Sequence, residues 1–530
     1  MTESATQAEA RRSDDDPVTH QEALSRDDSG RWTTAMKEEY DALINNNTWT
    51  LTELPKGRSA IKCKWVYKTK HDASGKVDRY KARLVIKGYS QRKGVDYDET
   101  YSPVVRHSSL RYLFAMAAKY NLQVDQMDAI TAFLQGDIEE EIYMEQPPCF
   151  VKPGGRQLVC RLNKALYGLK QSSRVWNTKL DAALKKLGLH QSEFDPCLYY
   201  WIEDGKVLFV AVYVDDVLIF SNDAALKNNL KAKLSSTFRM KDLGSAVSCL
   251  GIRITRAKGS VSLDQEAYID SMLRRFNMQD AKTVSTPMNT AEKLSKEMSP
   301  NTPEETERMK NIPYQEAVGC LMYLAQCTRP DILFTVNLLS RFNCCYGPKH
   351  WEAVKHLFRY LKGTKTIRLK YSAAGDSKLV GYSDADWASD LDDRRSKSGY
   401  VFLLQGGAVS WCCKRQSTVS LSTCEAEYMS LSAAVQEASW WRGLVSQFGE
   451  TDAIELRCDN QSTICIARNG GYTPRTKHID IRHHYIRDAL DRKIIQLNYV
   501  NTEEQVADGL TKPLQRVKLE RNRKAMGLLN

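Results

Sequence analysis

The feature that most constrains this chain is an apolar stretch that contains two adjacent acids. Residues 207–220 read Val-Leu-Phe-Val-Ala-Val-Tyr-Val-Asp-Asp-Val-Leu-Ile-Phe. A run so rich in β-branched and aromatic residues predicts two buried strands, with Asp215 and Asp216 at the bend between them. A buried carboxylate is costly unless its charge is compensated, and divalent cations suit this purpose because they prefer oxygen ligands. A surface hairpin turn, where Asp is common, is the alternative interpretation of these two residues alone.

The positive charge of the chain is concentrated in one early segment. The formal net charge of the whole chain is +11, and residues 56–93 alone hold thirteen Lys or Arg against two Asp. Four aromatic residues are interleaved with these cations: Trp65, Tyr67, Tyr80 and Tyr89. Basic side chains neutralise phosphates and aromatic rings stack on bases, so the segment predicts a nucleic-acid partner. A solvated basic hairpin without a partner is the alternative.

The cysteines and the apolar runs bear on the cellular compartment in which the chain is expected. None of the fourteen cysteines forms a Cys-x-x-Cys pair with a second pair or a His pair behind it, so a zinc module is not expected. No apolar run approaches the roughly twenty residues that span a bilayer. Without a signal peptide, we expect a reduced, intracellular chain with no membrane partner.

Two further motifs accompany the central hairpin. Residues 122–134 read Leu-Gln-Val-Asp-Gln-Met-Asp-Ala-Ile-Thr-Ala-Phe-Leu, and residues 166–174 read Leu-Tyr-Gly-Leu-Lys-Gln-Ser-Ser-Arg. Tyr-Val-Asp-Asp resembles the Tyr-x-Asp-Asp signature of reverse transcriptases. Together the three motifs resemble the polymerase region of copia-type (Ty1/copia) retrotransposon Pol polyproteins, and the resemblance runs from about Trp32 to the C-terminus. It implies that the catalytic, metal-binding carboxylates of a polymerase palm are Asp128, Asp215 and Asp216.

The resemblance also implies four nucleotide-binding residues. In the family, the Tyr-Lys-Ala-Arg-Leu-Val segment belongs to the fingers. Its Lys81 and Arg83 alternate along a strand, so they share a face that suits the triphosphate of an incoming nucleotide. Phe133 would pack beside the sugar and disfavour ribonucleotides, and Gln171 would contact the incoming nucleotide or the templating base pair. Ser173 stands where family members usually have Pro, so the turn there is expected to be looser.

A second set of acids follows from residue 379 onwards. Its order is strand–Asp, helix–Glu, strand–Asp and helix–Asp, which resembles the four-acid set of ribonuclease H: Asp384, Glu427, Asp459 and Asp508. Family spacing alone selects Asp384 over Asp386 and Glu427 over Glu425. Four carboxylates brought together repel one another unless cations bind between them, as in a two-metal phosphodiester hydrolase. Many ribonucleases H have a His before the last acid; here none follows the last strand, so no helper His is predicted.

The expected fold class is a multidomain chain of α+β and α/β type. It consists of a right-hand polymerase with fingers, palm and thumb, followed by a ribonuclease H-like α/β domain. The predicted divisions are a disordered leader (1–30), fingers and palm (31–275), a linker with thumb or connection helices (276–370) and the ribonuclease H-like domain (371–530). The Asp-Ser-Gly tripeptide at 28–30, typical of retroviral-type aspartic proteases, lacks flanking strands and is rejected.

Local patterns predict the individual elements. Within 32–51 a helix followed by a turn at 45–47 is expected, and further helices are expected at 108–120 with Ser108 as N-cap, 174–187, 224–238 and within 314–364. Strands are expected at 61–70, 77–87, 379–387, 400–411, 418–423, 454–460 and 494–500, with a turn at 72–75 and an exposed linker at 285–313.

The function implied by the resemblance is RNA-directed DNA polymerase activity, with ribonuclease H activity on RNA–DNA hybrids. Two Mg²⁺ ions are expected in each centre, with Mn²⁺ as the alternative. The expected partners are an RNA template, a DNA primer, an RNA–DNA hybrid and dNTPs, with other Pol products and capsid particles. The family implies cytoplasmic virus-like particles, with entry into the nucleus.

Two other functions are compatible with parts of the sequence. A host-adopted or decayed nucleic-acid-binding protein without catalysis would use the basic hairpin alone, but every required carboxylate is present in the expected order. A polymerase of group II intron or non-LTR type explains the palm motifs but not the copia-like segment at 164–174.

Overall fold

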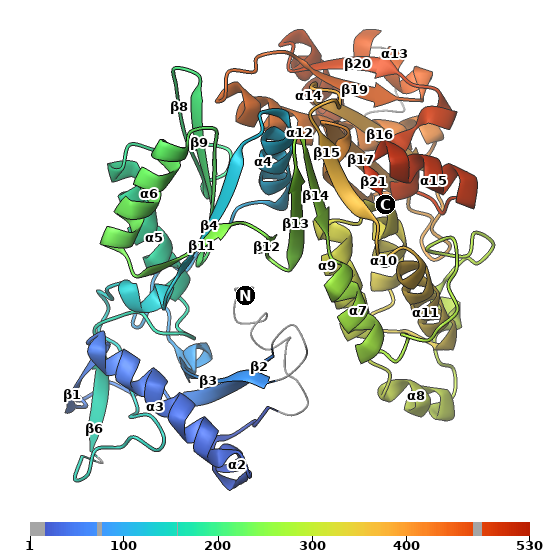
Figure 1. Ribbon diagram of the computed structural model, residues 1–530. Coiled ribbons are helices and arrows are strands. Elements are labelled where there is room, and N and C mark those ends of the chain that lie inside the picture. Colours follow the sequence, from blue (N-terminus) through green and yellow to red (C-terminus); the bar gives the residue numbers. More distant parts are fainter. Residues whose placement is uncertain (1–15, 72–76, 156, 470–479) are drawn as a thin grey trace.

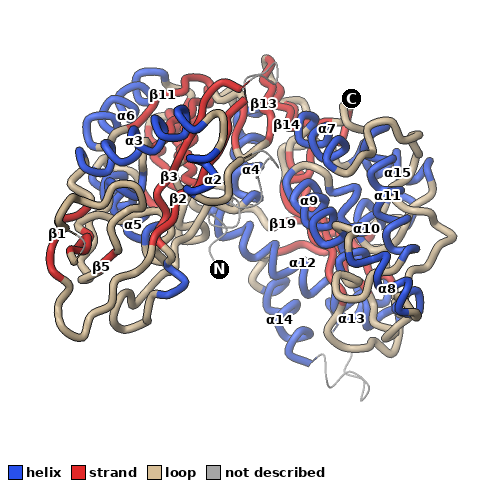
Figure 2. Tube along the Cα trace, turned by 90° about the horizontal axis from the view of Figure 1, so that it is seen from below, coloured by secondary structure: helices blue, strands red, loops and turns tan. Residues whose placement is uncertain are grey.

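The computed structural model describes residues 16–71, 77–155, 157–469 and 480–530. In Figure 1 the chain runs from an N-terminal part at lower left, through a sheet at upper left and helices at lower right, to a C-terminal sheet at upper right. Seen from below, helices α7 to α11 and α15 gather on one side, away from α3, β2 and β3 (Figure 2). The turn predicted at 72–75 lies outside the described residues. Of the helices within them, none is long and apolar enough to cross a bilayer.

The N-terminal part has its own hydrophobic core. Its elements are α2 (His20–Ser25), α3 (Ser29–Asn45), β1 (Trp49–Glu53), β2 (Cys63–His71), β3 (Val77–Ile86), η1 (Gly88–Ser90), β5 (Tyr143–Met144) and β6 (Leu158–Leu162). β2 and β3 form an antiparallel ribbon, a second sheet has the order β1-β6-β5, and α3 packs on β3. The core includes Trp32, Met36, Trp65 and Leu84. The helix expected within 32–51 begins earlier, at Ser29, and ends at Asn45, where the predicted turn at 45–47 begins; residues 49–51 belong to β1.

The predicted disorder of residues 1–30 is wrong for the part that the structure describes. Residues 1–15 lie outside the described ranges. Asp16 is buried, and its carboxylate accepts hydrogen bonds from the backbone N (2.8 Å) and hydroxyl (2.6 Å) of Thr69. The polar composition that indicated disorder instead supplies α2, capped by Thr19, and the first turn of α3.

The middle of the chain builds a six-stranded sheet in the order β11-β4-β10-β9-β8-β7. Its elements are α4 (His107–Lys119), β4 (Gln123–Ala129), η2 (Ala132–Gln135), α5 (Ser172–Lys186), β7 (His190–Gln191), β8 (Leu198–Glu203), β9 (Lys206–Tyr213), β10 (Asp216–Ser221), α6 (Ala224–Thr237) and β11 (Met240–Ser245). The predicted N-cap at Ser108 is wrong, since Arg106 has that position. Asp195, distant in sequence, accepts from the Arg106 backbone N (3.0 Å) and the Ser109 hydroxyl (2.6 Å), so a tertiary carboxylate replaces a local cap.

A five-stranded sheet joins three separate parts of the chain. Its order is β12-β13-β14-β15-β21, from β12 (Ser248–Cys249), β13 (Ile252–Ala257), β14 (Ser260–Asp264), β15 (Arg368–Ser372) and β21 (Leu528–Leu529). The helices between β14 and β15 are α7 (Glu266–Arg275), η3 (Lys296–Met298), α8 (Pro303–Lys310), α9 (Tyr314–Cys327), η4 (Pro330–Ile332), α10 (Leu333–Ser340) and α11 (Pro348–Gly363). The expected linker at 285–313 thus contains a helix, because Thr302 caps α8 and Pro303 opens it.

The C-terminal part is a mixed sheet in the order β18-β17-β16-β19-β20. Its elements are β16 (Val380–Asp386), β17 (Lys397–Leu404), β18 (Gly407–Arg415), α12 (Thr423–Ser446), β19 (Ile454–Cys458), α13 (Gln461–Asn469), α14 (Asp480–Asp491), β20 (Ile495–Tyr499), η6 (Thr502–Glu504), η7 (Val506–Leu510) and α15 (Arg516–Ala525). The expected single strand at 400–411 is a hairpin, because Gln405 and Gly406 both have positive φ and form a tight turn. The expected strand at 418–423 is a loop leading to Ser422, the N-cap of α12.

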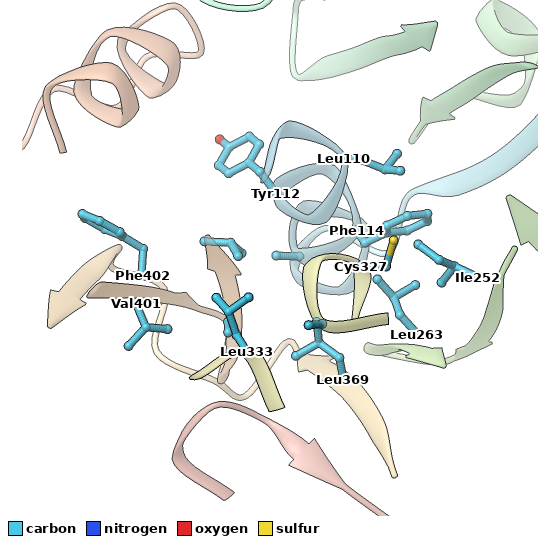
Figure 3. Close-up of a cluster of buried hydrophobic side chains, with 14 of the residues drawn as sticks. Leu110, Tyr112, Phe114, Ile252, Leu263, Cys327, Leu333, Leu369, Val401 and Phe402 are labelled. Atoms are coloured by element: carbon cyan, nitrogen blue, oxygen red, sulfur yellow. The ribbon is translucent and has the colours of Figure 1, made fainter. Parts of the chain in front are cut away.

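The helix α4 lies at the centre of the larger hydrophobic core. Ten consecutive residues of α4 are buried, from Ser109 to Ala118, and the helix packs on β14, β15 and β18. Figure 3 shows its Leu110, Tyr112 and Phe114 among side chains of the five-stranded sheet that contains β13 to β15 and of the C-terminal sheet. One continuous core therefore extends from residue 105 to residue 528, and the division predicted at 370 does not separate two cores.

Arg111 ties α4 to the C-terminal sheet with polar contacts. Its guanidinium donates to the backbone oxygens of Val409 (2.8 Å), Gln326 (2.7 Å) and Cys327 (3.0 Å), and it lies 3.8 Å from the ring centroid of Trp411. Burial lowers the pKa of Arg111 to about 10. A buried guanidinium with three carbonyl acceptors is costly to separate from any of them, so it fixes the two parts against each other.

Candidate active sites

Three of the predicted acids meet at one end of the six-stranded sheet; Asp128, Asp215 and Asp216 are called the hairpin site. β10 pairs antiparallel with β4, and the register places Asp216 directly opposite Asp128. Asp216 also faces Tyr213 across the β9–β10 hairpin, so Asp215 belongs to the turn. All three carboxylates are half-buried. The hairpin is not an isolated surface hairpin, because other strands of the sheet flank both β9 and β10.

The turn of the hairpin is held in a strained conformation. Val214 has φ of 55°, which is unusual for a β-branched residue and costs roughly 1–3 kcal/mol. The backbone oxygen of Val214 accepts from the indole of Trp176 (2.7 Å), and that of Asp215 accepts from the backbone N of Ala129 (2.9 Å). Contacts from two neighbouring elements therefore fix the position of the acids.

The hairpin site is electrostatically short of positive charge. Burial, and then repulsion from Asp215 and Asp128, raises the pKa of Asp216 to about 6, although Gln126 donates to its Oδ1 (2.9 Å). Burial and then Asp215 also raise the pKa of Asp128. Nearby cations, of which Lys81 has the largest effect, oppose this shift without abolishing it. Carboxylates with raised pKa at the open end of a sheet fit a bound cation.

Two of the four predicted nucleotide-binding residues, Lys81 and Arg83, lie close enough to Asp128 to lower its pKa, and Phe133 is connected to Arg83 through Tyr167. Lys81 and Arg83 are half-buried on one face of β3, as the alternation predicted. Burial and then Arg83 lower the pKa of Lys81. The Arg83 guanidinium lies 4.6 Å from the ring centroid of Tyr167, and that ring is 4.7 Å from the ring of Phe133. Phe133 is nearly buried, at 6% exposed, so Tyr167 is the aromatic surface between it and the cations.

Gln171 does not have the position predicted for it. Only 1% of the residue is exposed. Its amide nitrogen donates to the backbone oxygen of Asp96 (2.8 Å), and its amide oxygen accepts from the side chain of Gln91 (3.0 Å). Gln171 therefore holds the loop at 91–96 in place, and a direct contact with a nucleotide is contradicted by its burial.

The aromatic residues of the basic segment also depart from expectation. Trp65 and Tyr67 are 3% exposed and belong to the N-terminal core, and Tyr80 packs edge-on against Trp32 (4.6 Å). Tyr89 alone of the four is strongly exposed, at 79%. The alternating pattern that predicted base stacking thus reflects one buried and one cationic face of the β2–β3 ribbon.

The four later acids gather where parallel strands of the C-terminal sheet end. They are called the C-terminal site: Asp384, Glu427, Asp459 and Asp508. β16 and β19 run parallel with Ser383 opposite Cys458, so Asp384 and Asp459 follow neighbouring strand positions. α12, which carries Glu427, packs on β16, and η7, which carries Asp508, packs on β16 and β17. Ligand atoms of Glu427, Cys458 and Asp459 lie within 4.8 Å of one another.

Burial governs the electrostatics of the C-terminal site. It raises the pKa of Glu427 to about 9, with further repulsion from Asp384 and Asp459. Burial also raises the pKa of Asp384 to about 7, opposed by Lys512. One carboxylate oxygen of Glu427 is buried without a hydrogen-bond partner among the described residues. An orphaned acidic oxygen between two other acids fits a divalent cation.

Two lysines already neutralise the last acid of the set. Asp508 is fully buried, and its two carboxylate oxygens lie 2.7 Å from the ammonium groups of Lys512 and Lys518. Lys512 is also 3.7 Å from Asp384, which accepts a hydrogen bond from the Thr511 hydroxyl. Asp384 and Asp508 are thus bridged by a lysine, whereas Glu427 and Asp459 face each other.

The structure separates the alternatives that the sequence left open. Glu425 is the third residue of α12, and its carboxylate accepts from the backbone N of Leu421 (2.8 Å) while Ser422 accepts from the backbone N of Glu425 (3.2 Å). Glu425 thus satisfies the backbone N–H of the residue before the N-cap, while Ser422 caps the helix, so Glu425 has a structural role. After burial, repulsion from Asp384 is the largest cause that raises the pKa of Glu427, whereas burial raises the pKa of Asp386 and a hydrogen bond with Ser389 opposes that rise.

Sequence reasoning missed several residues that shape the sites. Lys512 lies four residues after Asp508, a helical spacing that could have indicated an ion pair. Gln126 precedes Asp128 by two residues and so shares its strand face, which was also detectable. No sequence signal could have placed Tyr167 between Arg83 and Phe133, because that contact joins three distant segments.

The chain is similar in sequence to several known proteins. Residues 46–290 match the family described as reverse transcriptase (RNA-dependent DNA polymerase). The chain is 45% identical over 519 residues to the retrovirus-related Pol polyprotein from transposon TNT 1-94 of Nicotiana tabacum, covering 97% of this chain and 39% of the relative. It is 34% identical over 313 residues to the putative transposon Ty5-1 protein of Saccharomyces cerevisiae, covering 59% of this chain and 100% of the relative.

A solved structure of foamy viral protease-reverse transcriptase in complex with dsDNA aligns over 89% of this chain and 83% of that chain, with TM-score 0.48 and 13% identity. The chain spans 39%, 35% and 33% of the length of three curated Pol polyproteins that it matches.

Proposed function

The chain belongs to the copia-type retrotransposon Pol polyproteins, and from this premise we propose that it is an RNA-directed DNA polymerase with a C-terminal ribonuclease H. The predicted fold class is confirmed: a right-hand polymerase is followed by a ribonuclease H-like domain. The observation that carries the proposal is the strand register that sets Asp216 opposite Asp128, with Asp215 in the adjoining turn. This arrangement brings three carboxylates together at a site rimmed by Lys81 and Arg83.

The residues at and around the hairpin site would have separate roles in nucleotidyl transfer. Divalent cations held by the carboxylates of either site supply Lewis-acid chemistry, activating the attacking oxygen and stabilising charge on phosphate. Asp128, Asp215 and Asp216 would hold them in the hairpin site. Lys81 and Arg83 would neutralise the phosphates of the bound dNTP, and their place on a paired strand keeps them oriented before the substrate arrives. Phe133, through Tyr167, would limit the room beside the sugar.

The C-terminal site would cleave the RNA strand of an RNA–DNA hybrid. Asp384, Glu427 and Asp459 would hold cations, since Glu427 and Asp459 face each other and Glu427 has an unpartnered oxygen. Asp508 departs from this pattern because Lys512 and Lys518 occupy its oxygens. These lysines would have to move before Asp508 could take part. The A-form shape and the 2′-hydroxyls of the hybrid would distinguish its RNA strand.

The remaining parts of the proposal rest on family membership. Mg²⁺ is the proposed cation, with Mn²⁺ as the alternative. The proposed partners are an RNA template, a DNA primer, dNTPs, other Pol products and capsid particles. The proposed location is intracellular, in cytoplasmic virus-like particles with entry into the nucleus.

The test is primer extension on an RNA template with Mg²⁺, with a labelled RNA–DNA hybrid in the same reaction. Asp215→Asn should abolish extension and keep hybrid cleavage, because the two sites use different carboxylates. Asp204→Asn is the matched control: Asp204 is exposed at the tip of the neighbouring β8–β9 hairpin, and Asn tolerates its positive φ of 49°. Wild-type protein that binds hybrid in a salt-sensitive way but never extends a primer would refute the polymerase and favour a binding protein without catalysis.

A further inference from the structure

We propose that Cys458 provides a thiol ligand inside the C-terminal site and makes it a selective site for thiophilic divalent cations such as Zn²⁺ and Cd²⁺. Binding of such a cation uses Glu427 and Asp459 and so excludes Mg²⁺ from them. The inhibitory consequence rests on the proposed nuclease function, whereas the binding itself does not.

The position of Cys458 carries the inference. Cys458 is the last residue of β19, directly before Asp459, and it is fully buried. Its Sγ, a carboxylate oxygen of Glu427 and one of Asp459 lie within 4.8 Å of one another. Among the residues that the structure describes, this is the only set of three potential metal ligands so close together. Zinc ligands at about 2.0–2.3 Å from the ion need only a small contraction from these separations.

Two further observations indicate that the three ligands are ready for a cation. Glu427 is 7% exposed, and its Oε2 is buried without a hydrogen-bond partner, so the oxygen has unused acceptor capacity. The backbone N of Asn460 lies 3.4 Å from the Cys458 sulfur and donates to it, which orients the sulfur as outer-shell partners orient metal ligands. Asp459 is half-buried, so the set can be reached from its side.

The chemistry of the donors sets the selectivity. Thiolate ligands favour Zn²⁺ and related soft cations, whereas Mg²⁺ prefers oxygen and retains its waters. The hairpin site offers carboxylate oxygens, and although Cys249 lies near Asp216, no comparable set of three ligand atoms forms there among the described residues. Zn²⁺ should therefore inhibit hybrid cleavage at lower concentration than it inhibits primer extension.

The experiment compares Cys458→Ser and Cys458→Ala with Cys465→Ser in the full chain. Cys465 is an exposed cysteine on the neighbouring helix α13 and controls for other thiols. One readout is the thermal shift produced by Zn²⁺ without substrate, since a ligand that binds only the folded state raises its stability. A second is the ultraviolet charge-transfer absorbance of Cd²⁺–thiolate bonds at one equivalent of Cd²⁺. The third is the Zn²⁺ concentration that halves hybrid cleavage, relative to each variant's own Mg²⁺ rate.

The expected result is that both Cys458 variants weaken Zn²⁺ binding and raise the half-inhibitory concentration by about tenfold or more, while Cys465→Ser behaves as wild type. Glu427→Gln, which is isosteric, should weaken the Zn²⁺ shift as well and gives an independent check if a Cys458 variant fails to fold. Unchanged Zn²⁺ binding in a folded Cys458 variant would overturn the proposal. Failure of wild type to cleave hybrid with Mg²⁺ would overturn the nuclease function, but a Cys458-dependent Zn²⁺ shift would still establish the metal site.

Discussion

Two glutamates at the start of α12 should have opposite roles: Glu425 should contribute to stability and Glu427 to hybrid cleavage. Glu425 accepts from the backbone N of Leu421, the residue before the N-cap, at 2.8 Å, and its own backbone N donates to the Ser422 hydroxyl. Glu427, one half-turn further on, has no such structural bond for its Oε2 and faces Asp459. We therefore expect Glu425→Ala to lower the free energy of unfolding and keep hybrid cleavage, and Glu427→Gln to do the reverse.

The structure sets the size of each effect. Loss of the Glu425 carboxylate removes one capping hydrogen bond and one favourable charge from the first turn of a helix, for a cost of about 1 kcal/mol. Glu425→Gln should cost less, because an amide oxygen can still accept from the backbone N of Leu421. Glu427→Gln should slow cleavage by about 100-fold or more, since removal of a direct metal ligand exceeds the roughly 10–100-fold cost of changes in its outer shell.

The pKa of Glu427 determines the stability of its variant. Burial raises this pKa from 4.5 to about 9, so the metal-free folded protein binds a proton that the unfolded chain has released. The stabilisation from protonated Glu427 is complete below pH 4.5 and is lost as the pH rises through about 9. Gln cannot ionise and avoids this loss. Metal-free Glu427→Gln should therefore be at least as stable as wild type at pH 8.

The assay combines urea unfolding in EDTA at pH 8 with single-turnover cleavage of a labelled hybrid in Mg²⁺. Primer extension by the same preparations controls for the integrity of the remainder of the chain. Loss of cleavage in Glu425→Gln together with retained cleavage in Glu427→Gln would refute the assignment of the two residues. A large loss of stability in metal-free Glu427→Gln would refute the argument that its carboxylate is held without a partner.

Three other perturbations test different parts of the structure. Arg329→Met should lower the free energy of unfolding, measured in urea, by about 3–5 kcal/mol, because it leaves the charge of the fully buried Asp331 unpaired. Adding Asp331→Leu should recover most of that loss. A double variant no more stable than the single one would contradict this. Gly168→Ala should reduce primer extension more than hybrid cleavage, because its Cβ would lie 2.1 Å from the backbone oxygen of Ile86; equal losses would indicate general unfolding. Burial raises the pKa of Asp216 to about 6, so the Mg²⁺ concentration needed for extension should rise as the pH falls through about 6 and a proton competes for the carboxylate; a requirement that stays flat down to pH 5 would be contrary to this.

Predictions from the sequence were most accurate where the alternation of side chains along a strand placed charged residues. Asp215 and Asp216 were placed in a hairpin by the apolar runs beside them, and the alternation of Lys81 and Arg83 along β3 was enough to put them on one face. These patterns depend on neighbouring residues alone. The register that brings Asp128 opposite Asp216 required the resemblance, because nothing local specifies which distant strand pairs with the hairpin.

The errors arose where a tertiary contact decided the outcome. Ser108 has the residue type of a cap, but Asp195 from a distant segment binds the start of α4 instead. Gln171 lies in the expected motif, but hydrogen bonds to Gln91 and Asp96 bury it. Composition indicated a loop before residue 313, although the same Thr and Pro residues begin α8. In each case the residue type was consistent with the prediction, but the local sequence does not specify the distant group with which the residue interacts.

The burial of α4 on all sides determines how this protein can be divided experimentally. A fragment that ends before residue 371 would expose the face of α4 that packs on β18 and would leave Arg111 without the carbonyl of Val409. It would also lose β21 and its pairing with β15. The two proposed centres use different carboxylates, but one continuous core lies between them. Deletion of either part therefore also removes shared packing, so single-residue variants are the cleaner way to separate the two proposed activities.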